Sequence, residues 1–333
     1  MGTVELVRIA RRTGFCYGVR EAIDHARVSA MEGRDTITLG QTVHNEGVIA
    51  DLRARGIRTV DTIDAIEPGS SVVIRAHGVT PDIRERAVAR GLDVIDGTCS
   101  WVVQEHREVA KLVAEGYTIV LLGTPNHPEV VGILGYAQDA IVVDEEDEWD
   151  AVPRTKRMAL VSQSTQPPWK FQKLAAFMVS RAHELRIVNT VCPVTIRRQE
   201  DTIALAREVD FMVVVGGRNS ANTKELTRLV GLEGRPVVQI ERASDLVDAG
   251  VFDGYRVVGI TGGTSTPIED LETVAARVLE LAGTADTQAQ APELAAAAIA
   301  EVADPAYRST SIGRSDRRPV PASRRSPVAA AHA

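Results

Sequence analysis

Apolar and polar positions follow two repeating patterns along the chain. Short apolar-rich runs have the length of a strand, and other segments carry apolar residues three and four positions apart, which is typical of an amphipathic helix. The strand-like runs include 37–39, 119–122 and 211–215, and the helix-like segments include 19–31, 101–115 and 194–207. Strands that alternate with helices predict parallel βαβ units, in which each helix returns the chain to the same edge of a sheet. The pattern therefore predicts an α/β fold.

The three cysteines of the chain mark a repeat in this pattern. Each follows a short apolar run, and 28 residues after each cysteine comes a polar residue that follows another apolar run. The pairs are Cys16 with His44, Cys99 with His127, and Cys192 with Ser220. Each repeat predicts a strand, a cysteine turn, a helix, a strand, a polar turn and a helix. Three repeats predict three pseudo-symmetric lobes with mostly parallel sheets.

The repeat also divides the chain. We expect a first lobe at 1–96, completed by the segment near 262–282, a second lobe at 97–191 and a third at 192–261. From about Gly283 the composition changes to alanine, glutamine, proline and arginine, with little that can bury an apolar face. We therefore expect 283–333 to be a disordered tail.

Charge and hydropathy narrow the classes of partner. The net charge is -7 and the first 300 residues contain no basic run, so we expect no nucleic-acid partner. Residues 1–15 have no apolar core of a secretory signal, and the longest apolar runs are far shorter than a membrane span. We expect a cytoplasmic protein in a reducing compartment, where thiols stay reduced.

Three cysteines are an unusual number for structural purposes. Disulfides need pairs, and the cysteines lie too far apart in sequence to form a local chelate. Four thiolates would close a cluster or a structural zinc site, whereas three leave one coordination position open for a substrate. Three unrelated buried cysteines are the alternative interpretation.

Polar residues at the same strand ends suggest an anion site. His44, His77 and His127 occupy turns that follow strands, and imidazoles at helix amino termini suit a phosphate. Hydroxyl and amide side chains occupy the corresponding turns of the second and third lobes: Ser164, Thr165, Ser220, Asn222 and Ser265. Any one of these serines or asparagines is more often a helix cap, but the whole set favours binding.

Glu129 follows Pro128 in the first turn of a predicted helix. An acidic residue there stabilises the helix dipole, which is the structural interpretation. Beside a metal with an open position, the same carboxyl is a competent general acid.

Ordered motifs along residues 5–282 carry a resemblance to a known family. They are Gly-Phe-Cys at 14–16, His-Asn at 44–45, Ala-His-Gly at 76–78, Thr-Cys at 98–99, Gly-x-x-x-His-Pro-Glu at 123–129, the cysteine at 192, Asn-Ser-x-Asn at 219–222 and Ser-x-Pro at 265–267. Together they resemble the LytB family of 4-hydroxy-3-methylbut-2-enyl diphosphate reductases.

The resemblance implies three lobes around a central [4Fe–4S] cluster that is held by Cys16, Cys99 and Cys192, with the fourth iron free. It implies that Glu129 supplies protons, and that Ser164 takes the place of a threonine that usually helps to relay them. The implied reaction removes the allylic hydroxyl with two electrons from a donor such as ferredoxin or flavodoxin with its reductase. Isopentenyl and dimethylallyl diphosphate are the implied products, at the last step of the methylerythritol phosphate pathway. The implied diphosphate ligands are His44, His77, His127, Ser220, Asn222 and Ser265.

Some positions depart from the family pattern: Ser100, Ser164, Pro193 and Ala221. These departures leave open a divergent paralogue that acts on a related allylic diphosphate. A zinc hydrolase with three cysteine ligands and a non-enzymatic iron–sulfur sensor are the alternatives from other classes.

Overall fold

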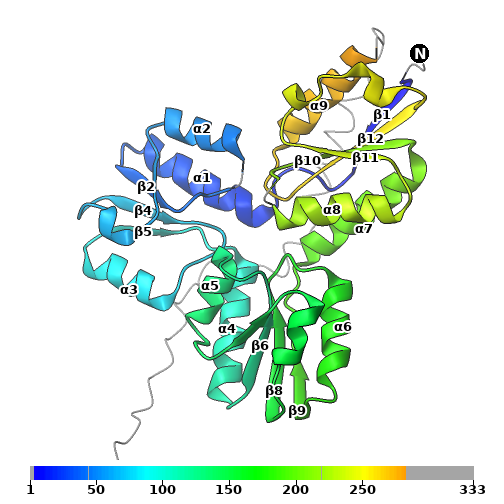
Figure 1. Ribbon diagram of the computed structural model, residues 1–333. Helices are drawn as coiled ribbons and strands as arrows, with labels where there is room; N and C mark the ends of the chain where they lie inside the picture. The colour runs from blue at the N-terminus through cyan, green and yellow to red at the C-terminus, as the bar shows by residue number, and fades with distance from the viewer. Residues whose placement is uncertain (1–3, 44, 219, 283–333) are drawn as a thin grey trace, which may run out of the picture.

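The computed structural model describes residues 4–43, 45–218 and 220–282, and these form three lobes (Figure 1). Each lobe contains one four-stranded sheet, and every strand pair in the three sheets is parallel. This confirms the predicted α/β fold of three lobes with parallel sheets. His44 and the predicted tail at 283–333 lie outside the described residues.

The first lobe is built on the sheet order β3-β2-β4-β5. Its strands are β2 (Thr36–Leu39), β3 (Arg58–Val60), β4 (Ser71–Ile74) and β5 (Asp93–Asp96). Its helices are α1 (Tyr17–Met31), α2 (Glu46–Ala54), α3 (Pro81–Ala89) and the 3₁₀ helix η1 (Ile63–Ala65).

The second lobe repeats that order as β7-β6-β8-β9. Its strands are β6 (Thr118–Leu122), β7 (Ile141–Val143), β8 (Thr155–Ser162) and β9 (Ala182–Ile187). Its helices are α4 (Ser100–Ala114), α5 (Pro128–Leu134), α6 (Pro168–Met178) and the 3₁₀ helix η2 (Glu146–Ala151).

The third lobe has the order β11-β10-β12-β1, so its last strand comes from the start of the chain. Its strands are β10 (Phe211–Val215), β11 (Val237–Ile240), β12 (Val257–Gly262) and β1 (Leu6–Ile9). Its helices are α7 (Pro193–Glu208), α8 (Ala221–Leu232), α9 (Ile268–Leu281) and the 3₁₀ helices η3 (Ala243–Asp245) and η4 (Ala249–Phe252).

The position of β1 corrects the division made from the sequence. The sequence division places β1 in a first lobe at 1–96, but Leu6 pairs with Val257 in the third sheet. The reason is that the strand before each cysteine completes the preceding sheet, as β5 does before Cys99 and β9 before Cys192. Helix α9, expected to complete the first lobe, packs on β1 and β12 of the third sheet.

Buried strands explain why these apolar runs form parallel sheets. All five residues of β10 are buried, and their side chains alternate between two core clusters. Val213 and Val215 pack in a cluster with residues of α9, whereas Met212 and Val214 pack in a cluster with residues of α7 and α8. A sheet that is covered on both faces has continuous apolar strands rather than alternating ones.

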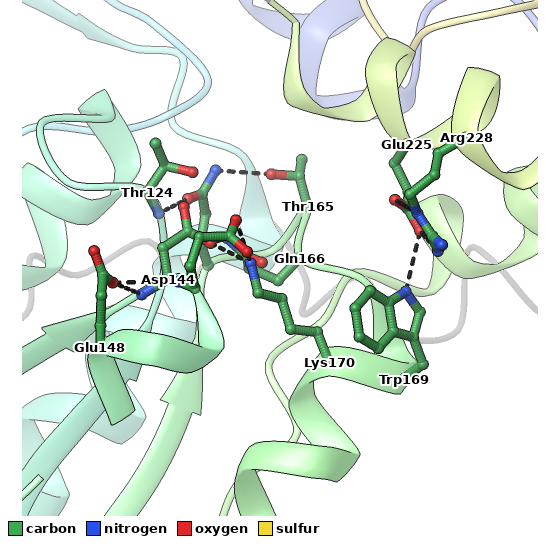
Figure 2. Close-up of polar contacts among 11 residues, drawn as sticks. Thr124, Asp144, Glu148, Thr165, Gln166, Trp169, Lys170, Glu225 and Arg228 are labelled. Atoms are coloured by element: carbon green, nitrogen blue, oxygen red, sulfur yellow. Dashed lines mark hydrogen bonds and ion pairs between the residues drawn. The ribbon is translucent and has the colours of Figure 1, made fainter. Parts of the chain in front are cut away.

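Specific side chains join the lobes to one another. The Asn45 amide donates to Asp270 over 2.9 Å, which links the first lobe to α9. Figure 2 shows a second link, in which Trp169 of α6 donates to Glu225 of α8 over 3.3 Å, while the Arg228 guanidinium lies 5.0 Å from the Trp169 ring. Within the described ranges, no helix combines the length and the apolar character that crossing a membrane requires.

Candidate active site

The three cysteines occupy the same place in each lobe. Cys16, Cys99 and Cys192 are the residues that immediately precede α1, α4 and α7, and each is half-buried. Because the preceding strands are parallel members of similar sheets, these helix starts lie at the carboxyl ends of the strands, the edge at which open α/β sheets bind ligands.

The backbone holds each cysteine by an equivalent hydrogen bond. In every case the cysteine amide donates to the carbonyl oxygen that stands two residues after the third strand of a sheet. The bonds are Cys16 to Thr264 at 3.1 Å, Cys99 to Ala76 at 3.0 Å, and Cys192 to Ser164 at 2.8 Å. The repeat seen in the sequence is therefore also a repeat in hydrogen bonding.

The three thiols lie near one another. A Cβ atom added to Gly18, two residues after Cys16, would lie 2.6 Å from the Sγ atom of Cys99, so only glycine fits there. Burial raises the pKa of Cys99 to about 12, and the neighbouring Cys16 and Cys192 sulfurs contribute to that rise. Burial likewise raises the pKa of Cys192 to about 11, with a contribution from Cys16. The three sulfurs thus share one site.

This donor set fits an iron–sulfur cluster. Metals bind thiolates, and a buried thiol with a raised pKa ionises when a cation lies beside it. Burial raises the pKa of Cys16, and the amides of Val19 and Gly18 at the start of α1 act against that rise because they stabilise the thiolate. No three His, Cys, Asp or Glu side chains of the described residues are grouped tightly enough to hold one ion. In a cluster each thiolate binds a different iron, which suits three separate helix starts.

Arg198 supports this site, and the sequence interpretation missed it. The residue is buried on α7, and its guanidinium donates to the carbonyls of Gly262 at 2.8 Å, Gly263 at 2.9 Å and Gly14 at 2.7 Å. It therefore ties the loop before Cys16 to the end of β12. Burial raises the pKa of the Cys16 thiol, and the positive charge of Arg198 opposes that rise.

Glu129 is buried beside the cysteines, at the start of α5. Its carboxyl accepts a hydrogen bond from the Ser164 hydroxyl at 2.9 Å and another from the Ser164 amide. Burial raises the pKa of Glu129, while the two bonds from Ser164 act against the rise. Because the charge of Glu129 also helps to raise the pKa of Cys192, the carboxyl lies near the thiol site.

Two of the predicted histidines come together from different lobes. The rings of His77, which follows β4, and His127, which precedes α5, lie 5.2 Å apart at 87°. His127 also caps its helix, because its Nδ1 atom accepts from the Glu129 amide at 3.2 Å. The structure therefore brings a first-lobe and a second-lobe imidazole to one place, next to the acid.

The third lobe contributes buried polar groups. Ser220 caps α8 by accepting from the Thr223 amide at 3.3 Å. Asn222 is 3 % exposed, and neither polar atom of its side chain has a hydrogen-bond partner among the described residues. The buried Thr223 hydroxyl, which the sequence interpretation missed, stands 2.5 Å from where a Cβ of Gly216 would be. Ser265 is half-buried after β12.

Thr165 belongs to a network that ties two strand ends together (Figure 2). Its hydroxyl accepts from the Gln163 amide at 2.8 Å, and the other end of Gln163 accepts from the Thr124 amide at 3.0 Å. Farther along the same edge, Lys170 forms an ion pair with Asp144 at 2.6 Å. The turns after β6 and β8 are thereby held in fixed positions.

Comparisons with known proteins agree with this geometry. The family model described as LytB protein matches residues 7–279. A 4-hydroxy-3-methylbut-2-enyl diphosphate reductase of Geobacter sulfurreducens is 38% identical over 273 residues, which cover 82% of this chain and 96% of that protein. A solved (E)-4-hydroxy-3-methyl-but-2-enyl diphosphate reductase, described as the terminal enzyme of the non-mevalonate pathway, is similar with 35% identity and a TM-score of 0.65, over 83% of this chain and 99% of that one. The Plasmodium falciparum E-1-hydroxy-2-methyl-but-2-enyl-4-diphosphate reductase is similar with 25% identity and a TM-score of 0.76, over 82% of this chain and 87% of that one.

Proposed function

Because the chain belongs to the LytB family of 4-hydroxy-3-methylbut-2-enyl diphosphate reductases, we propose that it carries out the family reaction with the residues described above. The reaction is the reductive removal of the hydroxyl of (E)-4-hydroxy-3-methylbut-2-enyl diphosphate. It consumes two electrons and two protons, releases water, and yields isopentenyl and dimethylallyl diphosphate, the last step of the methylerythritol phosphate pathway.

Cys16, Cys99 and Cys192 are the proposed ligands of the iron–sulfur cluster that enzymes of this family use. The observation that supports this most directly is the set of three equivalent amide bonds, which hold the three cysteine backbones in equivalent positions around one site. A [4Fe–4S] cluster held by three thiolates would supply the electrons and one iron that is open to the substrate hydroxyl.

The diphosphate is the proposed ligand of the polar groups around that site. His77 and His127 supply imidazoles from two lobes, and Asn222 offers a buried amide whose hydrogen-bonding capacity is unused by the described residues. Ser220, Ser265 and Thr165 complete the set, together with His44, which lies outside the described residues. Donors from three lobes would fix the reacting carbon at the cluster.

Glu129 is the proposed proton donor. Because its pKa is raised, the Glu129 carboxyl stays protonated to a higher pH than an ordinary glutamate, which a general acid needs. The Ser164 hydroxyl bonds to Glu129, which supports its proposed role in proton delivery. Glu129 lies on α5 and Ser164 in the turn after β8, so their hydrogen bonds join the helix to the end of that strand.

An anaerobic preparation tests the proposed function. We expect about four irons and four sulfides per chain and, with a reduced dye as donor, conversion of the allylic diphosphate to the two products. Zinc without sulfide would favour a hydrolase, and a cluster without turnover would favour a sensor. Replacing any one of the three cysteines by serine should abolish cluster retention. A serine variant with a full cluster and normal turnover would refute the ligand assignment.

Partners and location follow from the same chemistry. The electrons need an external donor, and we propose ferredoxin or flavodoxin with its reductase. Thiolate ligands persist in a reducing compartment, so we propose that the protein acts in the cytoplasm.

A further inference from the structure

The position six residues after each cysteine faces the position two residues before another cysteine. Ala22 on α1 faces Gly97, where an added Cβ would lie 3.2 Å from the Ala22 Cα. Arg198 on α7 bonds to the Gly14 carbonyl at 2.7 Å. Glu105 on α4 lies near the Thr190 hydroxyl but forms no hydrogen bond with it. The three-lobed repeat therefore places three different side chains in equivalent positions.

Packing and hydrogen bonding explain the residues at two of these positions, Ala22 and Arg198. Ala22 is small and apolar and fits tightly, and Arg198 makes three hydrogen bonds to backbone carbonyls. Glu105 differs, because it is 1 % exposed and neither of its carboxyl oxygens has a hydrogen-bond partner in the described part of the chain. A buried carboxyl without partners is costly, so its presence needs a reason beyond packing.

Among the described residues, Glu129 is the acid whose charge acts on Glu105. Helix α5, which packs against α4 (Figure 1), brings Glu129, and β6, which also packs against α4, has no ionisable side chain. The loop before α7 brings Thr190, whose hydroxyl already donates to the Ser162 carbonyl at 2.7 Å, and Cys192 follows two residues later. Burial and the charge of Glu129 raise the pKa of Glu105 well above its ordinary value.

We propose that Glu105 holds a reserve proton for Glu129, so that the two form a proton-holding carboxyl pair at the edge of the active site. The inference rests on the proposed role of Glu129 as donor. Two carboxyls near one another do not both ionise readily, so the pair retains at least one proton, and the burial of each carboxyl favours retention of the second. A pair that holds two protons matches a reaction that consumes two.

The transfer changes no oxidation state. Glu129 gives its proton to the departing hydroxyl and becomes a carboxylate. The O–H bond of Glu105 then breaks as an O–H bond forms on Glu129, and the negative charge moves to Glu105. Since Glu105 does not bond to Glu129 in this structure, the step requires a rotation of its side chain or a bridging water. Solvent protons reload the pair when the product leaves.

The test compares Glu105→Gln with Glu108→Gln, a matched change on the same helix at a half-buried position. We expect Glu105→Gln to keep the cluster and substrate binding but to lose roughly tenfold or more in steady-state turnover. Its first-turnover hydroxyl loss should stay near wild type, because Glu129 is intact. The alkaline limb of its pH profile should move to lower pH, and Glu105→Asp should recover part of the rate. Glu108→Gln should match wild type throughout.

A readout independent of turnover keeps the inference refutable if glutamine impairs folding. The infrared spectrum of the wild-type protein at neutral pH should contain the carbonyl band of a protonated carboxyl, and this band should be diminished in Glu105→Gln. An ionised Glu105 at neutral pH overturns the proposal, and so does a Glu105→Gln enzyme with wild-type rate and pH profile. Glu129→Gln is measured in parallel. If that variant is fully active, the proposed role of Glu129 fails, whereas an inactive Glu129→Gln beside a normal Glu105→Gln refutes only the reserve proton.

Discussion

Replacing Arg198 by methionine should lower the free energy of unfolding by about 3–5 kcal/mol. The guanidinium is 3 % exposed and donates to three backbone carbonyls at 2.7, 2.8 and 2.9 Å. Each hydrogen bond to a charged group contributes about 1.5–3 kcal/mol, but the three contributions are not additive, because all three come from one guanidinium. Methionine also keeps the apolar contacts of the arginine stem. Since a typical domain is stable by only about 5–15 kcal/mol, the loss would be large.

Urea unfolding under anaerobic conditions, followed by circular dichroism, measures this effect. A parallel shift of the transition with an unchanged slope shows lower stability rather than a changed unfolded state. Arg197→Met is the matched control, because Arg197 is the exposed neighbour on the same helix and should change little. Arg198→Lys should recover part of the loss, because lysine keeps the charge but not the planar fork of donors. If Arg198→Met unfolds within about 1 kcal/mol of wild type, the carbonyl bonds do not stabilise the site as we argue.

Three further changes address the proposed site. His127→Ala should weaken substrate binding by about tenfold or more while leaving the cluster spectrum unchanged, and wild-type affinity in a binding titration would remove His127 from the anion site. Glu129→Gln should bind substrate and keep the cluster yet lose at least about a hundredfold in turnover; a slightly less stable but fully active variant would show that Glu129 only serves the helix. The pKa of Glu105 is raised in the folded state, so the folded protein binds this proton more tightly than the unfolded chain does. The free energy of unfolding therefore falls as the pH rises from the ordinary pKa of 4.5 toward the folded-state pKa, by up to about 1.4 kcal/mol per pH unit. Glu105→Gln should therefore gain stability relative to wild type across that range in pH-dependent unfolding, and a constant difference would contradict the raised pKa.

The repeat in the sequence was sufficient to predict the three lobes, because apolar spacing and turn position are local properties of βαβ units. It did not predict that β1 joins the third sheet, since pairing between Leu6 and Val257 is a long-range choice that no local pattern encodes. Arg198 and Glu105 were missed for a related reason. Both lie inside helices, where a charged residue is usually exposed, and packing against segments that are distant in the sequence buries them. Aligning the three repeats on their cysteines would have placed the two residues at the same position.

The candidate site was predictable where its residues stand at strand ends. His77, His127 and Glu129 follow apolar runs, so the parallel sheets place each of them at the carboxyl edge of its own sheet. The contact between the His77 and His127 rings depends in addition on how the first two lobes pack. No sequence pattern marked Thr223 as a site residue, because it lies within the first turn of α8. Its hydroxyl belongs to the site only because it packs against Gly216 and against Gly263 after β12. Roles that depend on contacts between lobes are not visible in a single segment.

The pairing of β1 with β12 also governs the order of events during synthesis. Leu6 leaves the ribosome early, but its partner Val257 is made about 250 residues later, which at about 5–20 residues per second is a delay of roughly 12 to 50 seconds. During that interval β1 has no sheet to join, and the Cys16 amide lacks the Thr264 carbonyl that holds it in the finished fold. The first and second lobes can complete their own sheets while the chain is still growing. Iron delivered in that interval would meet two positioned thiols and one unplaced one, so stable cluster insertion should follow the release of β12 from the ribosome.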